Sequence, residues 1–319
     1  MFRIGILGAA DIAYNKFMPA LEMVEGVECA GVASNTAEKL SKFTQKYSVK
    51  VYSSYDAVIE DEDVDCVYIP LPPAFHYEWA RKALIAGKHV FLEKPSTTSL
   101  AQTKELVQLA AARGLVIQEN YMFQYHAQLK AIRDVIDSGE LGKVRLYRTS
   151  FGFPRRPGRD FRYIKELGGG TMLDNGGYTV KLANILLGDS IRLVSSHLDY
   201  DEETGVDIFG SAEFVNDEGV VVQTAFGMDC QYQCSLEVWG SHGRLTTGRI
   251  YTAPAGFKVS ALIETGSGSR EIELPCDDHF VRSIECFIHA VTDEKQREEL
   301  AEGCIKQAAL VENIKEQVD

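Results

Sequence analysis

The sequence places one lysine where a catalytic group is expected. An apolar run from His89 to Leu92 ends abruptly in Glu93, Lys94 and Pro95. Such a run is typical of a buried parallel strand, and the carboxyl edge of an open α/β sheet is where catalytic groups gather. Charged residues also end strands simply because strands meet water there. Lys94 is therefore a catalytic candidate that needs support from the rest of the chain.

A second pair of candidates lies on a helix further along the chain. Three glycines at 168–170 lead into a helical segment that carries Asp174 and Tyr178. A spacing of four places both side chains on one face of the helix, so both can point at the same place. The alternative is structural: Tyr178 is a buried aromatic residue and Asp174 interacts with the helix dipole.

The first residues have the pattern of a nucleotide-binding turn. An apolar strand over residues 2–7 is followed by Gly8 and a helical pattern. This order can aim free N–H groups at the pyrophosphate of a dinucleotide. The chain departs from G-x-G-x-x-G, because Ala10 and Ala13 stand at the second and third glycine positions. The turn is predicted to bind through Gly8, Ala10, Asp11 and Ile12.

The end of the next strand, over residues 27–34, indicates which dinucleotide binds. An acidic residue here would bind the ribose hydroxyls of NAD, but the chain has Ser34, Asn35 and Thr36, with Lys39 one helical turn later. These residues offer donors and a cation, and no carboxylate that would repel a 2'-phosphate. We therefore expect NADP(H) to be preferred over NAD(H), with Ser34, Asn35 and Lys39 in contact with it.

Alternating strands and helices must position these residues. Strand patterns at 2–7, 27–34, 65–70, 89–94 and 115–120 alternate with helical patterns, which predicts a doubly wound parallel sheet of the Rossmann type. After about residue 124 most segments have strand character, at 144–151, 191–198, 206–214, 219–226, 236–239, 258–264 and 270–274, and two helices close the chain. We predict an α/β fold: a Rossmann domain over residues 1–121, and a C-terminal α+β domain over residues 122–319 with a large, mostly antiparallel open sheet. The uncovered face of such a sheet predicts a homodimer or homotetramer that packs through it.

Composition limits the possible functions. The 319 residues are 45% hydrophobic, enough for two domains with their own cores. A formal charge of -13 argues against a nucleic-acid or anionic-membrane surface, so an anionic ligand needs a local basic site. Seven scattered cysteines lack the spacing of a zinc site and indicate reduced thiols. No apolar stretch reaches about 18 residues, and the first residues have strand rather than signal-peptide character. We expect a cytoplasmic protein with no metal.

Several of these motifs together resemble the Gfo/Idh/MocA family, named after glucose-fructose oxidoreductase and inositol dehydrogenase. They are the Gly8 turn, Pro70-Leu-Pro72 followed by His76, Glu93-Lys94-Pro95, and Glu119-Asn120 followed by Met122-Phe123. The resemblance covers essentially the whole chain. It implies a cis peptide bond between Lys94 and Pro95, which is feasible because an X-Pro bond has a cis penalty of only about 1 kcal/mol. It also implies a cofactor site that includes Pro70, Leu71, His76, Glu93 and Asn120.

The resemblance suggests roles for the candidate catalytic residues. In the family a histidine usually follows the aspartate by four residues, whereas this chain has Tyr178, as do branches that resemble nucleotide-sugar 3-ketoreductases and dihydrodiol or xylose dehydrogenases. Reduction of a ketone by NADPH needs a hydride at carbon and a proton at oxygen, and a phenol can donate that proton when a cation lies nearby. The implied roles are Tyr178 as proton donor, Lys94 as polariser of the substrate oxygen, and Asp174 as a residue that orients the substrate or Lys94.

The segment before the catalytic helix holds four arginines in an otherwise acidic chain, Arg155, Arg156, Arg159 and Arg162. Guanidinium groups can bind a diphosphate by bidentate contacts, although a solvated loop or a clamp on the cofactor is equally compatible. The overall pattern is similar to the family's nucleotide-sugar 3-ketoreductases. That similarity implies substrate binding by Arg155, Arg156, Arg162, Tyr163 and Tyr232, with Arg249 also at the border of the pocket.

Two alternatives stay open at this point. One is an NADP-dependent dehydrogenase of a free sugar or a cyclic trans-diol. The other is a non-catalytic dinucleotide-binding regulator, supported only by the two missing motif glycines.

Overall fold

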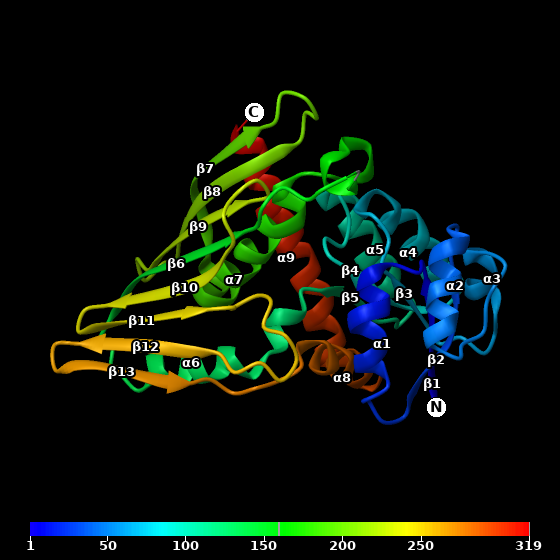
Figure 1. Cartoon of the computed structure of the whole chain (residues 1–319), viewed down its shortest axis with the longest axis horizontal. Coiled ribbons are helices and arrows are strands. Elements are labelled where there is room, and N and C mark those ends of the chain that lie inside the picture. The colour runs from blue at the N-terminus through cyan, green and yellow to red at the C-terminus, as the bar shows by residue number, and fades with distance from the viewer. Residues whose placement is uncertain (159, 319) are drawn as a thin grey trace. The chain divides into compact units, whose positions relative to one another are not determined.

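The computed structural model describes residues 1–158 and 160–318 and divides them into two units (Figure 1). The first unit contains Met1–Asn120 and Phe280–Ala308, and the second contains Tyr121–His279 and the chain from Ala309 onward. The predicted boundary after residue 121 lies within one residue of the first crossing. Residues 280–308 differ from the prediction, because they belong with the first unit. Their apolar side chains pack on the parallel sheet, as described below.

Within the described residues, the first unit forms a five-stranded parallel sheet in the order β2-β1-β3-β4-β5. This confirms the predicted doubly wound sheet, with its switch point between β1 and β3. The strands are β1 (Phe2–Leu7), β2 (Val27–Ala33), β3 (Cys66–Ile69), β4 (His89–Glu93) and β5 (Ile117–Asn120). The helices are η1 (Ala13–Phe17), α1 (Met18–Leu21), α2 (Ala37–Lys46), α3 (Tyr55–Glu60), η2 (Pro73–Phe75), α4 (His76–Ile85), α5 (Leu100–Ala112) and α8 (His279–Thr292). The first unit also holds the part of α9 (Glu294–Val318) that ends at Ala308.

Helices bury both faces of this parallel sheet. On one face the ring of Phe17 in η1 stacks on Tyr68 of β3, with 3.8 Å between centroids, and Phe287 of α8 lies edge-on to Phe91 of β4 at 5.1 Å. On the other face α3, α4, α5 and part of α9 join one core, through fully or almost fully buried residues that include Val58, Leu84, Leu106 and Cys304. Continuous apolar strands such as β3 are buried on both sides for this reason.

Over its described residues the second unit is built on an eight-stranded sheet in the order β13-β12-β11-β10-β6-β9-β8-β7. Its strands are β6 (Val144–Gly152), β7 (Arg192–Tyr200), β8 (Asp207–Val215), β9 (Val221–Gly227), β10 (Gln233–Gly240), β11 (Gly243–Gly248), β12 (Ser260–Thr265) and β13 (Gly268–Glu273). Neighbours pair antiparallel except for β6 and β9, which run parallel, so the predicted mostly antiparallel sheet is confirmed. Strand β11 was not predicted, because glycine and threonine give it no apolar run.

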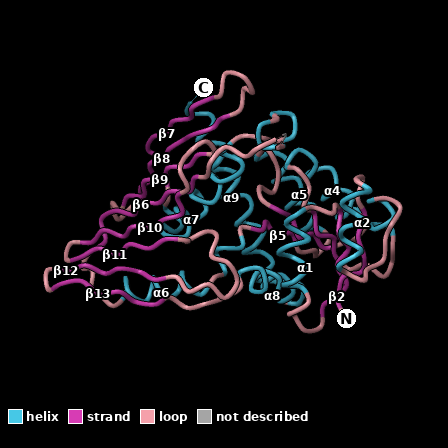
Figure 2. Tube along the Cα trace, viewed as in Figure 1, coloured by secondary structure: helices cyan, strands magenta, loops and turns pink. Residues whose placement is uncertain are grey.

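Helices of the second unit cover one side of this sheet, as Figure 2 shows for α6 and α7. They are η3 (Met122–Tyr125), α6 (Ala127–Asp137), η4 (Phe161–Tyr163), η5 (Lys165–Leu167), η6 (Met172–Gly176), α7 (Gly177–Leu187) and η7 (Gly188–Ser190). Strands alternate between buried and more exposed positions; in β10, Leu236 and Val238 are buried while Trp239 is 50% exposed. One side of the sheet is therefore a core, and the other carries exposed apolar side chains such as Trp239 and Leu262.

We predict that Phe287→Ala lowers the free energy of unfolding by about 3–5 kcal/mol, because a fully buried ring is removed from its contacts with Phe91 and Phe2. Urea unfolding measures the loss, and hydrogen exchange followed by mass spectrometry locates it. The added exchange should appear in residues 1–120. Phe257→Ala, which removes a ring that is 45% exposed, is the matched control and should cost less than about 1 kcal/mol. Added exchange confined to 121–279 would contradict the placement of α8 in the first unit.

Candidate active site

The predicted cofactor residues of the first unit lie at one edge of its sheet. Gly8, Ser34 and Pro70 directly follow β1, β2 and β3, while Glu93 and Asn120 end β4 and β5. Parallel strands bring all these carboxyl ends together. A dinucleotide binds outside this edge at the switch point, which here lies between Gly8 and Pro70.

The Gly8 turn has the geometry that a pyrophosphate needs. Gly8 has a φ of +118°, and a Cβ on it would lie 2.8 Å from Cδ2 of Leu71, so only glycine fits. The Gly8 N–H donates to the Ala33 carbonyl oxygen, and the Ala10 N–H donates to the Gly8 oxygen, both at 2.9 Å. The next N–H groups, from Asp11 and Ile12, belong to the first helical turn and have no acceptor within the helix. The turn therefore fits a dinucleotide although Ala10 replaces a glycine.

The end of β2 is shaped by a residue that sequence reasoning missed. Asn35 and Lys39 are exposed, and the Ser34 hydroxyl accepts from the Thr36 N–H at 3.2 Å. Burial raises the pKa of Tyr55, and a hydrogen bond with the backbone of Asn35 partly opposes that rise. This hydrogen bond from Tyr55 thus holds the turn after β2 in place. A tyrosine at the start of a short helix gives no sequence signal for this role.

The turn that carries Lys94 is held by side chains from neighbouring elements. The Lys94-Pro95 bond is cis, as the resemblance implied. The backbone N–H of Ser96 donates to Oε1 of Glu119 in β5 at 2.7 Å. Nδ1 of His76 lies 2.8 Å from the Pro95 carbonyl oxygen. The half-buried Lys94 therefore projects from a fixed backbone.

His76 joins this turn to the cofactor residues after β3. Its second ring nitrogen, Nε2, lies 2.7 Å from the Leu71 carbonyl oxygen. A neutral imidazole carries only one N–H, so it can donate to only one of these two carbonyl oxygens. Burial lowers the pKa of His76 to about 4 and the charge of Lys94 acts in the same direction, while the two carbonyl groups oppose the shift. Because burial dominates, the folded protein holds the neutral ring at ordinary pH.

In the second unit, the helix η6 and its continuation α7 dock on one end of the sheet. The Asn175 amide donates to the carbonyl oxygens of Phe151 and Gly227, at the ends of β6 and β9. The Met172 N–H donates to the partly buried carboxylate of Asp207 at the start of β8. Residues 172–176 form a π-helical turn, a feature that is frequent at functional sites.

Tyr178 lies among aromatic rings on this helix. It is 7% exposed, and its ring meets those of Tyr121 and Phe151 edge-on, with centroids 5.1 and 5.3 Å away. Its hydroxyl donates to Sδ of Met122 at 3.4 Å. Sequence reasoning placed Met122 and Phe123 as landmarks, but it did not find Phe151. A residue at the end of a strand in another part of the chain cannot be linked to Tyr178 by spacing.

Asp174 forms an ion pair that was not predicted. Its Oδ2 accepts from Nε of Arg162 at 2.7 Å. The same guanidinium donates to both carboxylate oxygens of Asp160, at 3.1 and 3.2 Å. Burial would lower the pKa of Arg162, but the two carboxylates more than offset that effect and raise it. Arg162, predicted as a substrate ligand, is therefore already neutralised within the protein.

The rest of the arginine loop is exposed and rests on aromatic rings. The Arg155 guanidinium lies 4.9 Å from the centroid of the Tyr163 ring and 3.5 Å from Asp201, and Arg156 lies 5.0 Å from the centroid of Phe153. The Tyr163 hydroxyl accepts from the Arg156 N–H at 3.0 Å and donates to the Met228 carbonyl oxygen at 3.1 Å. Arg159 lies outside the described residues. Arg155 and Arg156 keep charge that a ligand can reach.

Tyr232 and Arg249 form a further basic and aromatic pair. The Arg249 guanidinium donates to the Tyr232 hydroxyl at 2.9 Å and lies 4.8 Å from its ring centroid. Arg249 has a φ of +54°, a strained value for a residue other than glycine. Tyr232 directly precedes β10, whose first residue pairs with Gly152 at the end of β6. The pair therefore lies at the same end of the sheet as Phe153 and Asn175.

Comparison with known proteins identifies the chain. Residues 2–121 match the family described as "Oxidoreductase family, NAD-binding Rossmann fold", and residues 129–246 match "GFO/IDH/MocA C-terminal domain". The chain belongs to the Gfo/Idh/MocA family. It is an oxidoreductase of that family, as the resemblance implied.

Several relatives of this Gfo/Idh/MocA protein are sugar reductases. It is 37% identical over 313 residues to the dTDP-3,4-didehydro-2,6-dideoxy-alpha-D-glucose 3-reductase of Actinomadura kijaniata, covering 98% of this chain and 94% of that one. It is 39% identical over 324 residues, with the same coverages, to the enzyme of that name from Streptomyces violaceoruber. The structure of KijD10, a 3-ketoreductase from Actinomadura kijaniata with NADP and TDP-benzene, matches with a TM-score of 0.96 at 36% identity, covering 99% of this chain and 98% of that one. KijD10 variants with a tyrosine replaced by phenylalanine or a lysine by alanine have been solved with the same ligands.

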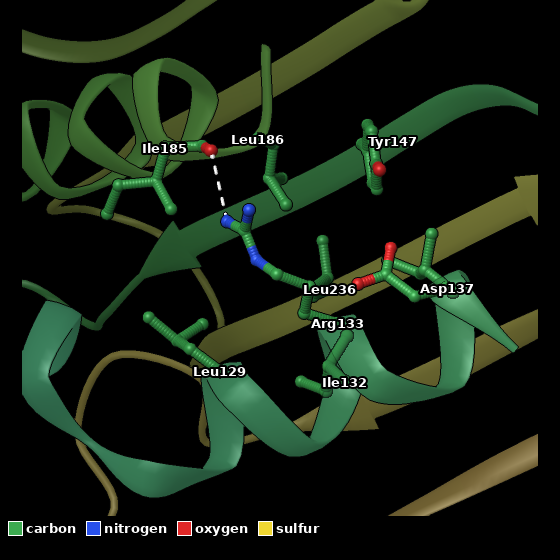
Figure 3. A pocket seen from close by; sticks show the side chains of 9 residues that line it. Leu129, Ile132, Arg133, Asp137, Tyr147, Ile185, Leu186 and Leu236 are labelled. Atoms are coloured by element: carbon green, nitrogen blue, oxygen red, sulfur yellow. Dashed lines mark hydrogen bonds between the residues drawn. The ribbon is translucent and has the colours of Figure 1, made fainter. Parts of the chain in front are cut away.

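A cavity in the second unit lies apart from these residues. It has a volume of about 180 Å³ and lies between α6, the end of α7, and strands β6 and β10 (Figure 3). Apolar residues such as Leu129, Ile132 and Leu236 line it, with Arg133, Asp137 and Tyr147 among them. None of the predicted site residues lines this cavity. Among the described residues, no group of three or more His, Cys, Asp or Glu side chains is placed to hold a metal ion.

We predict that neutral His76 gives the protein a specific sensitivity to acid. Its folded pKa, about 4, lies below the ordinary value of 6.5, so the unfolded chain takes up the proton first as the pH falls. The stabilisation by His76 is complete above about pH 6.5 and is lost progressively toward about pH 4, by up to about 3 kcal/mol. His76→Gln should remove this part of the acid dependence of urea unfolding.

Exposed His242 is the matched control. His242→Gln should keep the acid dependence of the unchanged protein. Equal dependence in His76→Gln and the unchanged protein would mean that the folded state protonates His76 between its two carbonyl groups.

Proposed function

We propose that the chain is an NADPH-dependent 3-ketoreductase that acts on a keto sugar carried by thymidine diphosphate. The observation that carries this proposal is the pair Lys94 and Tyr178. In the KijD10 variants, the replaced lysine and tyrosine are the same number of residues apart as Lys94 and Tyr178. Both residue types that were exchanged in a ketoreductase are thus present here at the same separation.

The chemistry follows from the side chains. NADPH, when bound, supplies the hydride that reduces the carbonyl carbon. Tyr178 donates the proton to the carbonyl oxygen, and its ring is held in place by aromatic neighbours. Lys94 polarises that oxygen from a backbone that His76 and Glu119 hold in place. Asp174 acts through Arg162, because their ion pair ties the catalytic helix to the loop before it.

The end of β2 supports NADP(H) as the cofactor. The exposed residues Asn35 and Lys39 and the Ser34 hydroxyl offer donors and a positive charge to a 2'-phosphate. The position at which NAD-binding proteins place a carboxylate has none here. The Gly8 turn and the residues after β3 hold the pyrophosphate and the rest of the dinucleotide.

The nucleotide part of the substrate is assigned to the exposed arginines of the second unit. Arg155 and Arg156 supply the charge for a diphosphate, and the rings beneath them limit the freedom of both guanidinium groups. Tyr163 and Tyr232 border the same end of the sheet and offer aromatic surface. The substrate of a free-sugar dehydrogenase carries no phosphate, so it gives no reason for this positive charge.

The exposed face of the large sheet and the state of the cysteines indicate how the protein assembles and where it is located. Exposed apolar residues on the open side of the large sheet, such as Trp239 and Leu262, support a homodimer or homotetramer that packs through that face. The seven cysteines are thiols rather than disulfides, which supports a reducing, cytoplasmic compartment. In residues 1–158 and 160–318, each helix is too short or too polar to span a bilayer.

Tyr178→Phe should lower kcat by about 100- to 10,000-fold, because it removes the proton donor and keeps the ring. Steady-state reduction of a dTDP-3-keto sugar measures kcat, and nicotinamide fluorescence should show NADPH affinity unchanged. Tyr147→Phe makes the same exchange in the cavity of Figure 3 and should leave kcat within about twofold. A kcat for Tyr178→Phe within a few-fold of the unchanged enzyme would falsify the role.

Calorimetric titration of NADPH-saturated protein with thymidine diphosphate tests the substrate class. We expect a Kd of about micromolar, weakened about tenfold or more when Arg155 and Arg156 are both replaced by alanine, because each loses a charge-assisted contact. Arg192→Ala removes an exposed arginine of β7 and should leave the Kd unchanged. If millimolar thymidine diphosphate produces no heat, it does not bind, and the proposed substrate class changes to free sugars and diols.

A further inference from the structure

Arg249 has a backbone conformation that side chains rarely adopt. Its φ is +54°, and within residues 1–158 and 160–318 it is the one residue other than glycine with a positive φ. A glycine would adopt this conformation without strain. Folded proteins keep such strain only where surrounding contacts enforce it, and strained residues cluster at functional sites. The presence of an arginine at this position therefore needs an explanation.

A buried side chain of α6 holds the backbone around Arg249. Gln128 is fully buried, and its Nε2 donates to the carbonyl oxygen of Ile250 at 3.0 Å and to that of Arg249 at 3.5 Å. Ile250 and Tyr251 are also fully buried, and the Tyr251 hydroxyl is hydrogen-bonded with that of Thr149 in β6. The core thus enforces the strained turn, while the Arg249 side chain is exposed.

The same segment forms part of the wall around the proposed catalytic tyrosine. The ring of Tyr251, two residues after Arg249, lies 5.9 Å from that of Tyr178, measured between centroids. Tyr251 also stacks on Phe151 at 5.1 Å, and Phe151 meets Tyr178 edge-on. All four residues belong to the second unit. The exposed arginine is therefore carried by a segment that contacts Tyr178.

The Arg249 guanidinium is oriented but keeps donors for a ligand. It donates from Nη1 to the Tyr232 hydroxyl at 2.9 Å and lies over the ring. A guanidinium has five N–H donors in one plane, so most of them are left for an anion, which they can bind in bidentate fashion. Among the residues that the structure describes, no carboxylate forms an ion pair with Arg249, whereas Arg155 and Arg162 each have one.

We propose that Arg249 binds the diphosphate of the substrate, and that Gln128 is a positioning residue, which holds Arg249 in its strained conformation beside the site. The proposal rests on the proposed function, which gives the substrate a diphosphate. It adds a third cation to Arg155 and Arg156, from a separate part of the chain. The strain at Arg249 is explained by the ligand that its side chain binds.

The competing explanation is that Arg249 merely packs on Tyr232 at the edge of the sheet. Arg249→Gly distinguishes the two explanations, because glycine adopts this φ without strain and the turn is kept. A packing role predicts that the variant binds ligand as the unchanged protein does. A ligand role predicts weaker binding, part of which Arg249→Lys restores because it keeps the charge without the planar fork.

Calorimetric titration of the NADPH-saturated, full-length protein with thymidine diphosphate measures this binding. Arg249→Gly should raise the Kd about tenfold or more, because a charge-assisted contact is lost, and Arg249→Lys should raise it less. Arg244→Ala is the matched control. It removes an exposed arginine from the other end of β11 and should leave the Kd unchanged. A Kd for Arg249→Gly equal to that of the unchanged protein would overturn the proposal.

A pair of variants tests Gln128 as a positioning residue. Gln128→Met removes the amide donor and keeps an unbranched side chain, so it should raise the Kd several-fold through Arg249. In the Arg249→Gly protein the same change should have no further effect, because the residue through which it acts is gone. An equal effect in both proteins would make Gln128 a structural residue only. If Gln128→Met does not fold, Gln128→Asn, whose amide is one carbon shorter, provides the same comparison.

Inorganic pyrophosphate separates this proposal from the proposed function. If the unchanged protein binds no thymidine diphosphate, the nucleotide substrate is wrong, and the titrations are made with pyrophosphate instead. Binding of pyrophosphate that is weakened in Arg249→Gly would support Arg249 as an anion ligand and overturn only the nucleotide. If the unchanged protein binds neither ligand, both proposals are overturned.

Discussion

The position of Lys94, the proposed catalytic lysine, depends on how two backbone groups in its turn are paired. The Pro95 carbonyl oxygen and the Ser96 N–H lie in a buried turn beyond the end of β4, and buried peptide groups need partners. His76 and Glu119 supply them. One comes from the first turn of α4 and the other from β5, so the turn ties together the elements on which the cofactor residues stand. A lysine on such a turn can act on a substrate without first being ordered by it.

In the second unit a single side chain, that of Asn175, pairs the backbone groups at the strand ends. Among its described strands, β6 and β9 form the one parallel pair, so their carboxyl ends meet and present the carbonyl oxygens of Phe151 and Gly227 side by side. The amide of Asn175 binds both, and in doing so it docks the helix that carries Asp174 and Tyr178. In each unit, then, parallel strand ends leave polar backbone groups that a side chain must satisfy. The catalytic candidates lie beside those side chains.

Sequence reasoning succeeded where the position of a residue follows from local pattern. Strand ends located Gly8, Glu93 and Lys94, because the periodicity of apolar residues shows where a strand stops. It could not show that Arg162 is neutralised by Asp160 and Asp174, because a charge gives no sign of its partner. The anchors Tyr55 and Phe151 escaped notice for a similar reason. Their roles arise from contacts between segments that are distant in the chain.

The first unit is built from residues 1–120 and 280–308. It therefore cannot be completed until residues 280–308 have been synthesised, after the whole of residues 121–279. The strands of the parallel sheet leave the ribosome first, but Phe287, which packs on Phe91, follows the whole second unit. Until then the apolar side of β4 lacks this partner, and such surfaces are where aggregation and chaperone binding begin. A chain that stops before residue 280 lacks α8 and α9, the helices that residues 280–308 contribute to the first unit. Loss of the residues after 308 leaves the first unit whole.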